Sequence, residues 1–384
     1  MQRQATIQAI QNPVEVSDWD QPAAVTLSWT CDEAADVEVR VGAPDGPVLS
    51  RTRGPGKATT SEWVMDEVTF FLQDVTGGMP LDGAHTLATV AVTVQPPGEG
   101  PRGVILMYHR IAEERSDTWT ICVSPPHFAE HLAVLSGSRE VVSLTELTST
   151  LKGGGIRHGS VVITFDDGYA DNLLHAMPLL ERRQLPATIF VTSGYVGDSR
   201  GYWWDELTEL ASNDGFVDSD LCSMLYRWLW PMGHEERRVC LDRLWRWARV
   251  SRPVLSARRP ASLEELRLLA NSSVIEIGAH SETHPPLDIL PGAEQLAEIR
   301  QSKRVLEEML NRGVSHFCYP YGNAGPRTPA LVKSAGFESA CLASGGPVSG
   351  GADLFRLPRV HVRDWDGAEF SRRLARWLGT GAAR

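Results

Sequence analysis

Hydrophobic and polar positions follow different patterns in the two parts of the chain. Up to about residue 95, short segments rich in valine, threonine and tryptophan alternate partly between apolar and polar positions, and turns such as Pro44-Asp45-Gly46 separate them. These segments are residues 24–31, 35–43, 62–75 and 85–94. A period of two without helical periodicity predicts β-strands. We therefore expect an all-β sandwich of the immunoglobulin or fibronectin type over residues 1–95.

A Pro/Gly-rich stretch, Gln95–Pro101, ends this pattern and predicts a linker over residues 96–102. Beyond it, continuous apolar runs alternate with amphipathic stretches. The apolar runs are residues 104–109, 161–165, 187–191, 274–279, 315–320 and 356–362. The amphipathic stretches are residues 126–135, 170–183, 293–310, 329–336 and 368–378. This alternation predicts an α/β domain over residues 103–384, with a parallel sheet that is either open or closed into a barrel. Functional residues are expected where its strands end.

One stretch interrupts the alternation, at about residues 196–271. It has mostly helical periodicity and predicts a helical insertion between two strands. Six of the twelve tryptophans lie in it: Trp203, Trp204, Trp228, Trp230, Trp245 and Trp247. Aromatic rings can stack on sugars, but large aromatics at helical spacing usually fill a core. We interpret most of these six as core residues.

Composition and charge narrow the functional classes. The chain has 384 residues, and 37 basic against 48 acidic residues give a net charge of −11 without any basic block. This argues against nucleic acid or an anionic membrane as a partner. The six cysteines form no C-x-x-C pair, which argues against a disulfide framework or a zinc ribbon. No apolar run near 18 residues and no signal-peptide pattern is found. We expect no transmembrane segment and a cytoplasmic protein.

Two adjacent carboxylates are the first candidates for chemistry. Asp166 and Asp167 directly follow the apolar run 161–165, and Gly168 permits a tight turn after them. Neighbouring carboxylates repel and are costly to bury without a cation or a proton between them. The alternative is a helix N-cap pair, a position that aspartate favours.

Two histidines follow another predicted strand. His280 and His284 have the i,i+4 spacing that can present both imidazoles to one metal, in a turn between Gly278 and Pro285. The chain holds a second such pair, His127 and His131, but that pair lies inside an amphipathic stretch, and we expect it on a helix surface. Two imidazoles and one carboxylate at strand ends would leave coordination positions open, as a catalytic metal requires.

These motifs together resemble carbohydrate esterase family 4, the polysaccharide deacetylases with a nodulation-protein-B homology domain. The resemblance covers about residues 103–378 without most of the insertion. It is carried by Thr164-Phe165-Asp166-Asp167-Gly168 and His280-Ser281-Glu282-Thr283-His284-Pro285. It implies a distorted TIM-like (β/α)7 barrel. It also implies that Asp166 is the general base, and that Asp167, His280 and His284 hold one divalent metal ion.

A third motif of that family departs from its usual form here. The family has R-x-P-Y-G, in which the arginine holds the base and the tyrosine backbone amide binds the oxyanion. This chain has Cys318-Tyr319-Pro320-Tyr321-Gly322, so Tyr321 keeps the amide while Cys318 stands at the arginine position. Another cation could restrain Asp166, and Arg359, near the end of the last predicted strand, is the best candidate.

The family's general acid is normally a histidine in a C-terminal L-x-H motif, and this chain has no clean copy of it. His361 follows Arg-Val instead. His109 ends the run VILMYH, which resembles the permuted members of the family, typified by poly-N-acetylglucosamine deacetylases, with an early Y-H motif. We favour His109 as the acid and keep His361 as the runner-up. The alternative for His109 is a packed histidine with local hydrogen bonds.

The resemblance implies a metal-dependent hydrolase that removes an N-acetyl or O-acetyl group from a carbohydrate and releases acetate. Zinc is the expected metal, with Ni²⁺, Co²⁺, Fe²⁺ and Mn²⁺ as alternatives. The expected partner is an N-acetylated glycan or sugar precursor, and residues 1–95 could bind glycan or a partner protein. Two other functions stay open. One is an amidohydrolase of the same superfamily acting on a small non-sugar amide or imide, and the other is an inactive glycan-binding protein.

Overall fold

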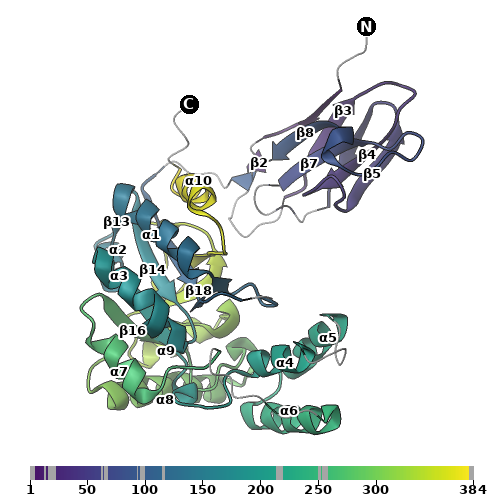
Figure 1. Ribbon diagram of the computed structural model, residues 1–384. Helices are drawn as coiled ribbons and strands as arrows, with labels where there is room; N and C mark the ends of the chain where they lie inside the picture. The colour runs from purple at the N-terminus through teal and green to yellow at the C-terminus, as the bar shows by residue number, and fades with distance from the viewer. Residues whose placement is uncertain are drawn as a thin grey trace. The chain divides into compact units, whose positions relative to one another are not determined.

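The computed structural model divides into two compact units, Met1–Glu99 and Gly100–Arg384 (Figure 1). It describes residues 5–12, 14–15, 23–61, 64, 68–92, 94–95, 100–114, 117–212, 219–249, 252 and 258–379. Most of the expected linker, residues 96–99, lies outside the described residues. Among the described residues, no helix combines the length and the apolar character that a membrane span requires.

The first unit contains two antiparallel sheets. One sheet has the strand order β1 (Thr6–Ala9), β3 (Thr26–Thr30), β6 (Gly56–Thr59). The other has the order β5 (Val48–Arg53), β4 (Asp36–Val41), β7 (Val68–Asp74), β8 (Thr86–Val92). A short parallel pair, β2 (Val14–Glu15) with β9 (Val94–Gln95), and a 3-10 turn, η1 (Gly83–His85), complete the described elements of this unit. The expectation of an N-terminal all-β domain is confirmed.

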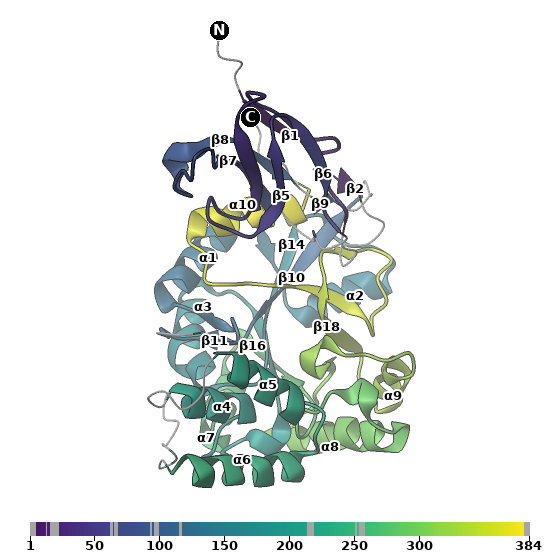
Figure 2. The ribbon, with the colours of Figure 1, turned by 90° about the vertical axis from the view of Figure 1, so that its right-hand side faces the viewer.

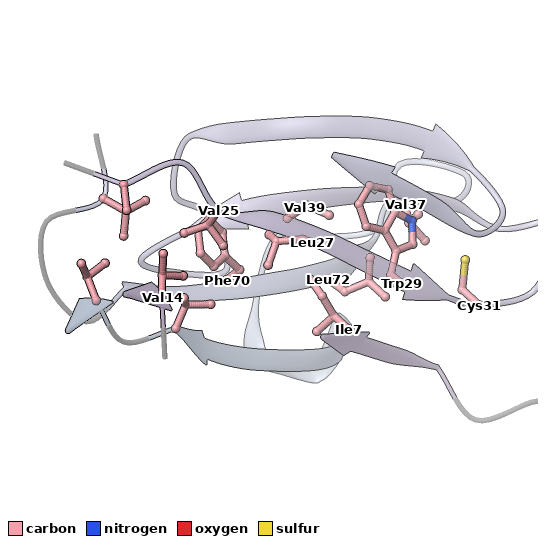
Figure 3. Packing of buried hydrophobic residues seen from close by; sticks show 14 residues of the cluster. Ile7, Val14, Val25, Leu27, Trp29, Cys31, Val37, Val39, Phe70 and Leu72 are labelled. Atoms are coloured by element: carbon pink, nitrogen blue, oxygen red, sulfur yellow. The ribbon is translucent and has the colours of Figure 1, made fainter. Parts of the chain in front are cut away.

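The core of this unit lies where the side chains of both sheets meet (Figure 3). Leu27 and Trp29 of β3 are buried two positions apart, and so are Phe70 and Leu72 of β7. Successive side chains of a strand point to opposite faces, so alternate apolar positions bring one face of each sheet into the core. The period of two in the sequence therefore has its physical cause in this packing.

The second unit is built around a closed ring of seven parallel strands (Figures 1 and 2). Their order is β14 (Ser160–Phe165), β15 (Ala187–Val191), β16 (Ile275–Ala279), β17 (His316–Cys318), β18 (Ser339–Gly345), β20 (Leu357–His361) and β10 (Arg102–Tyr108), which pairs again with β14. The short strands β13 (Glu140–Val141) and β19 (Val348–Ser349) extend this sheet, and β11 (Arg110–Ile111) pairs with β12 (Cys122–Val123). The expected (β/α)7 barrel is confirmed.

Helices cover the outside of the ring (Figure 2). They are α1 (Pro125–Ser138), α2 (Leu144–Lys152), α3 (Met177–Arg183), α7 (Leu263–Asn271), α8 (Gly292–Leu310), α9 (Thr328–Ser334) and α10 (Gly367–Trp377). Short helical turns connect them: η2 (Asn172–Ala176), η3 (Ser193–Tyr195), η4 (Leu287–Ile289) and η5 (Pro320–Gly322). Side-chain caps begin several helices. Ser262 and Glu265 form a capping box at α7, which satisfies backbone N–H groups that the first turn leaves unpaired.

Three helices between β15 and β16 form a group at one side of the barrel (Figure 1). They are α4 (Trp203–Ser212), α5 (Ser219–Leu229) and α6 (His234–Ala248), and α4 contacts both of the others. The helix α7 contacts β16 and α8 instead, so it belongs to the layer around the barrel. The helices of the stretch 196–271 therefore divide between this group and the barrel layer.

The expectation that His127 and His131 lie on a helix surface is wrong for His131. His127 is about one-third exposed on α1 and its Nδ1 lies 2.7 Å from Oδ1 of Asp364. His131 is fully buried, and its ring stacks on Phe370 of α10 at a centroid distance of 4.2 Å. Its two ring nitrogens contact the Tyr108 hydroxyl and the Trp365 carbonyl oxygen. Both nitrogens therefore have hydrogen-bond partners although the imidazole is buried.

Candidate active site

A cavity of about 200 Å³ at one end of the barrel strands is lined by six of the predicted site residues, among them Tyr321. Asp166 and Asp167 follow β14, His280 follows β16, and His109 follows β10. His284 enters from the turn after His280. Because the carboxyl ends of parallel strands lie at one end of a barrel, residues more than 170 positions apart meet there.

Three ligand-type atoms converge at the bottom of this cavity. Nε2 of His280 lies 3.6 Å from Oδ1 of Asp167, and Nε2 of His284 lies 3.4 Å from the same oxygen. The two Nε2 atoms are 3.2 Å apart. All three side chains are buried. Carboxylate and imidazole donors in this arrangement are typical of a catalytic zinc site with open positions.

The contacts and burial of these groups suit a cation. Nδ1 of His280 lies 2.9 Å from the Cys318 carbonyl oxygen, which can only accept, so Nδ1 carries the proton and Nε2 keeps its lone pair. Burial lowers the pKa of His280 to about 4 and that of His284 to about 3, so both rings are neutral at pH 7. Oδ1 of Asp167 is buried without a hydrogen-bond partner. These residues therefore fit a divalent cation, which would satisfy all three atoms at once.

A second group of three, Asp166, His280 and Cys318, also brings ligand-type atoms close together. Both carboxylate oxygens of Asp166 already contact Arg359, however. A cation at this position would face a buried guanidinium, so the Asp167 group is the better metal site.

The loops around the candidate metal site have unusual backbone conformations. Four of the eight non-glycine residues described with positive φ lie at this site: Asp167 (71°), Ser281 (61°), His284 (57°) and Tyr321 (59°). Left-handed conformations are uncommon for residues with a Cβ and concentrate where side chains are held for function. The Tyr202 hydroxyl donates to the Asp167 carbonyl oxygen at 2.5 Å, which stabilises one of these turns from the start of the helical group.

Asp166 is held by Arg359 in a bidentate ion pair. Nη1 of Arg359 lies 2.7 Å from Oδ1 of Asp166, and Nη2 lies 2.6 Å from Oδ2. The guanidinium also contacts the Thr164 hydroxyl and the sulfur of Cys318. Burial opposes ionisation of Asp166, but the charge and hydrogen bonds of Arg359 outweigh it and hold the pKa of this carboxyl well below its usual value. The structure thus brings Arg359 to Asp166, beside the cysteine that stands at the arginine position of the motif.

The two candidate acids lie side by side, with ring centroids 5.6 Å apart. Their strands are neighbours, and Met107 of β10 pairs with His361 of β20, so His109 follows just beyond. His109 lines the cavity, and His361 is absent from its described lining. Burial lowers the pKa of both rings, to about 3 for His361, while the charges of Asp166 and Asp167 oppose this shift at His109.

Tyr321 lies in the short helical turn η5 after β17, with its ring 4.5 Å from that of His284 between centroids. The next residue, Gly322, has a φ of 75°, and a Cβ there would lie 2.6 Å from the Cβ of Ala343. Only glycine fits this close approach, because any side chain would clash with β18. The turn therefore places Tyr321 against the cavity, which Tyr321 and Ala343 both line.

Sequence reasoning missed part of the cavity wall. Trp119 and Ile121 come from the segment between β11 and β12, Trp204 comes from α4, and Tyr226 comes from α5. The interpretation of the insertion tryptophans as mostly core was only partly right. Trp203, Trp204 and Trp245 are buried, whereas Trp228 and Trp247 are 53% and 64% exposed. Helical spacing could not separate a buried core position from a buried position beside a cavity.

Comparisons with known proteins agree with this geometry. Residues 154–239 and 250–340 match the family model of polysaccharide deacetylases. YxkH of Bacillus subtilis (strain 168), a protein named as a polysaccharide deacetylase, is 22% identical over 261 residues, which are 67% of this chain and 70% of that protein. The matched residues include both carboxylates, both metal-site histidines and the turn of Tyr321.

Solved structures of similar fold include IcaB from Ammonifex degensii, at a TM-score of 0.51 and 23% identity, covering 73% of this chain and 98% of that one. The Streptococcus pyogenes deacetylase PplD in complex with acetate is similar at a TM-score of 0.50 and 19% identity, covering 71% of this chain and 98% of that one. These likenesses support the barrel fold. The match of residues 154–239 and 250–340 to the family model identifies a polysaccharide deacetylase domain in this chain.

Proposed function

We propose that the chain is a metal-dependent hydrolase that removes an N-acetyl group from an acetylated sugar and releases acetate. The observation that carries the proposal is the buried group of Asp167, His280 and His284 next to an ionised Asp166, all facing one cavity. A water molecule that enters this cavity would meet three metal-ligand atoms and a carboxylate within a few ångströms. This combination supports hydrolysis of a substrate carbonyl.

Asp167, His280 and His284 would hold the metal, for which zinc is the first choice because two imidazoles and a carboxylate suit it. A divalent ion bound there would lower the pKa of a bound water from 15.7 to about 7 and would polarise the acetyl carbonyl. Asp166 takes the proton of the attacking water. Its lowered pKa keeps the carboxyl ionised at neutral pH. Each carboxylate oxygen that contacts Arg359 retains a second lone pair, which is able to accept the proton. Arg359 thereby fixes the direction of the carboxylate.

Tyr321 and His109 would complete the reaction. The backbone N–H of Tyr321, in its strained turn, stabilises the negative charge that develops on the acetyl oxygen. His109 protonates the amine as the carbon–nitrogen bond breaks, because an amine is a poor leaving group without a proton. Burial lowers the pKa of both histidines, but His109 lines the cavity, whereas His361 is absent from its described lining. We therefore assign the acid to His109.

Replacing His109 by alanine should lower kcat by about 10²–10⁴-fold, which is the usual contribution of a positioned general acid. His361→Ala is the matched control, because the neighbouring imidazole is removed while His109 stays at the cavity. It should lower kcat by less than about tenfold. Steady-state acetate release by the zinc-loaded full chain measures both effects. A larger loss in His361→Ala would assign the acid to His361 instead.

The proposed activity is tested by acetate release from the zinc-loaded full chain. We expect release from N-acetylglucosamine oligomers, with N-acetylglucosamine and a nucleotide sugar that carries it as comparison substrates. Release only from small non-sugar amides or imides would favour the amidohydrolase alternative. Metal binding without any hydrolysis would favour a glycan-binding protein. The complete set of ligand, base and acid candidates in one cavity argues against that last alternative.

A further inference from the structure

Aromatic side chains from outside the barrel strands form one wall of the cavity. Trp119 belongs to the segment between β11 and β12, and Trp204 and Tyr226 belong to α4 and α5. We call Trp119, Trp204 and Tyr226 the aromatic wall. None of the three is among the residues assigned to the metal or to the chemical step. They line the same cavity as the proposed metal ligands, base and acid.

The aromatic wall is held rigidly by its own contacts. The indole N–H of Trp119 donates to the Thr208 hydroxyl at 2.8 Å and lies 3.2 Å from the Trp204 carbonyl oxygen, which joins the two segments. The ring of Tyr226 lies between neighbours, with its centroid 4.6 Å from that of Trp119 and 4.8 Å from that of Trp203. A wall that is ordered before binding loses little entropy when a ligand arrives.

Trp204 is anchored on the side away from the cavity. Its indole N–H donates to the Tyr169 hydroxyl at 2.8 Å, and its ring stacks on Tyr202 with centroids 4.5 Å apart and planes 8° apart. Its ring also lies 4.8 Å from that of His284. Trp204 therefore packs between the helical group and the metal ligands, and it mainly supports the wall.

Trp119 and Tyr226 differ from Trp204 because they are only half-buried, although each is large and partly apolar. Packing within the protein therefore leaves part of each ring accessible from the cavity. Burial raises the pKa of Tyr226 to about 12, the charge of Arg237 opposes this shift, and the charge of Asp167 adds to it. The phenol thus lies within electrostatic range of the metal site and stays protonated at neutral pH.

We propose that the aromatic wall binds the sugar ring that carries the acetyl group. Trp119 contacts the apolar C–H face of the pyranose, and the Tyr226 hydroxyl hydrogen-bonds to polar groups of the same ring. Sugars combine apolar faces with polar edges, and an aromatic ring with a polar tip suits both. The cavity of about 200 Å³ is below the range of about 300–1,000 Å³ for drug-sized ligands, so its size suits one sugar unit better than a longer glycan. This inference rests on the proposed function and names the residues that select its substrate.

The test compares two acetylated substrates, the N-acetylglucosamine trimer and ethyl acetate, which has no ring. In zinc-loaded full chain, Trp119→Ala and Tyr226→Phe should each raise KM for the trimer, by about tenfold and about threefold, with kcat changed less than about twofold. For ethyl acetate, kcat/KM should stay within about twofold of the unaltered chain. Trp228→Ala is the control, because Trp228 lies on the same helix α5, is 53% exposed and is not part of the cavity lining. This variant should leave the kinetic constants for both substrates unchanged.

Several outcomes would overturn the proposal. Equal losses of kcat/KM on both substrates would mean that the aromatic wall only maintains the fold of the site. An unchanged KM for the trimer would mean that the sugar ring binds elsewhere. Tyr226→Phe keeps the ring and its packing, so it stays informative if Trp119→Ala fails to fold. An unaltered chain that releases acetate from ethyl acetate but from no acetylated sugar would overturn the proposed function itself. If the unaltered chain is active on the trimer and the Trp119 and Tyr226 variants keep the same KM, only the proposal about the aromatic wall would be overturned.

Discussion

Replacing His280 by alanine is expected to remove the bound metal and to lower acetate release by at least about 10³-fold. His280 supplies one of three converging ligand atoms, and its Nε2 lies 3.2–3.6 Å from the ligand atoms of His284 and Asp167. With two ligands left, the site loses affinity and the water loses the ion that makes it acidic near pH 7. Elemental analysis of the purified chain gives the metal per chain, expected to fall from about one to near zero, and an acetate assay gives the rate.

His127→Ala is the matched control for this change. His127 belongs to the other i,i+4 histidine pair, but it lies partly exposed on α1 and contacts Asp364. Metal content and rate should both stay at the level of the unaltered chain. Removing the metal with a chelator should have the same effect as His280→Ala, and added zinc should restore only the unaltered chain. Full activity in chelator would contradict the metal site.

Asp166→Asn is expected to keep the metal and to lower kcat by at least about 10³-fold. The amide of asparagine cannot accept a proton from the attacking water, so the base is lost while Asp167, His280 and His284 are unchanged. The change also leaves Arg359 buried without its carboxylate, which costs about 3–5 kcal/mol of the free energy of unfolding. Metal analysis, acetate release and chemical denaturation measure the three effects separately.

A double variant separates the loss of the base from the loss of stability. Asp166→Asn with Arg359→Met removes both buried charges, so its free energy of unfolding should recover most of the loss in the single variant. Its kcat should stay as low as in Asp166→Asn alone. Recovery of activity together with stability would show that Asp166 acts only through folding, and the assignment of the base would be wrong.

The parallel sheet could be predicted largely from continuous apolar runs, because strands buried on both sides by other elements need apolar residues at every position, whereas its closure into a barrel was implied by the family resemblance. Six of the seven strands have such runs. The seventh, β18 (Ser339–Gly345), reads Ser-Ala-Cys-Leu-Ala-Ser-Gly, in which small residues of low β-propensity hide the pattern. It is a strand only because β17 and β20 pair with it on either side. Closure of the ring thus depends on β18, although the residues of β18 alone hardly predict a strand.

By itself, the sequence determined the metal-ligand and base candidates, the all-β N-terminal domain and the parallel α/β class of the second unit. Each of these depends on local order along the chain: an Asp-Asp pair after a strand, two histidines four positions apart, a period of two or continuous apolar runs. Only the tertiary structure decided which residues from distant segments meet. Arg359 reaches Asp166 across 193 positions, and Trp119 and Tyr226 contact one another from separate segments. Such contacts arise from the closing of the barrel and the docking of α4 and α5, and no local pattern of residues encodes the distance between them.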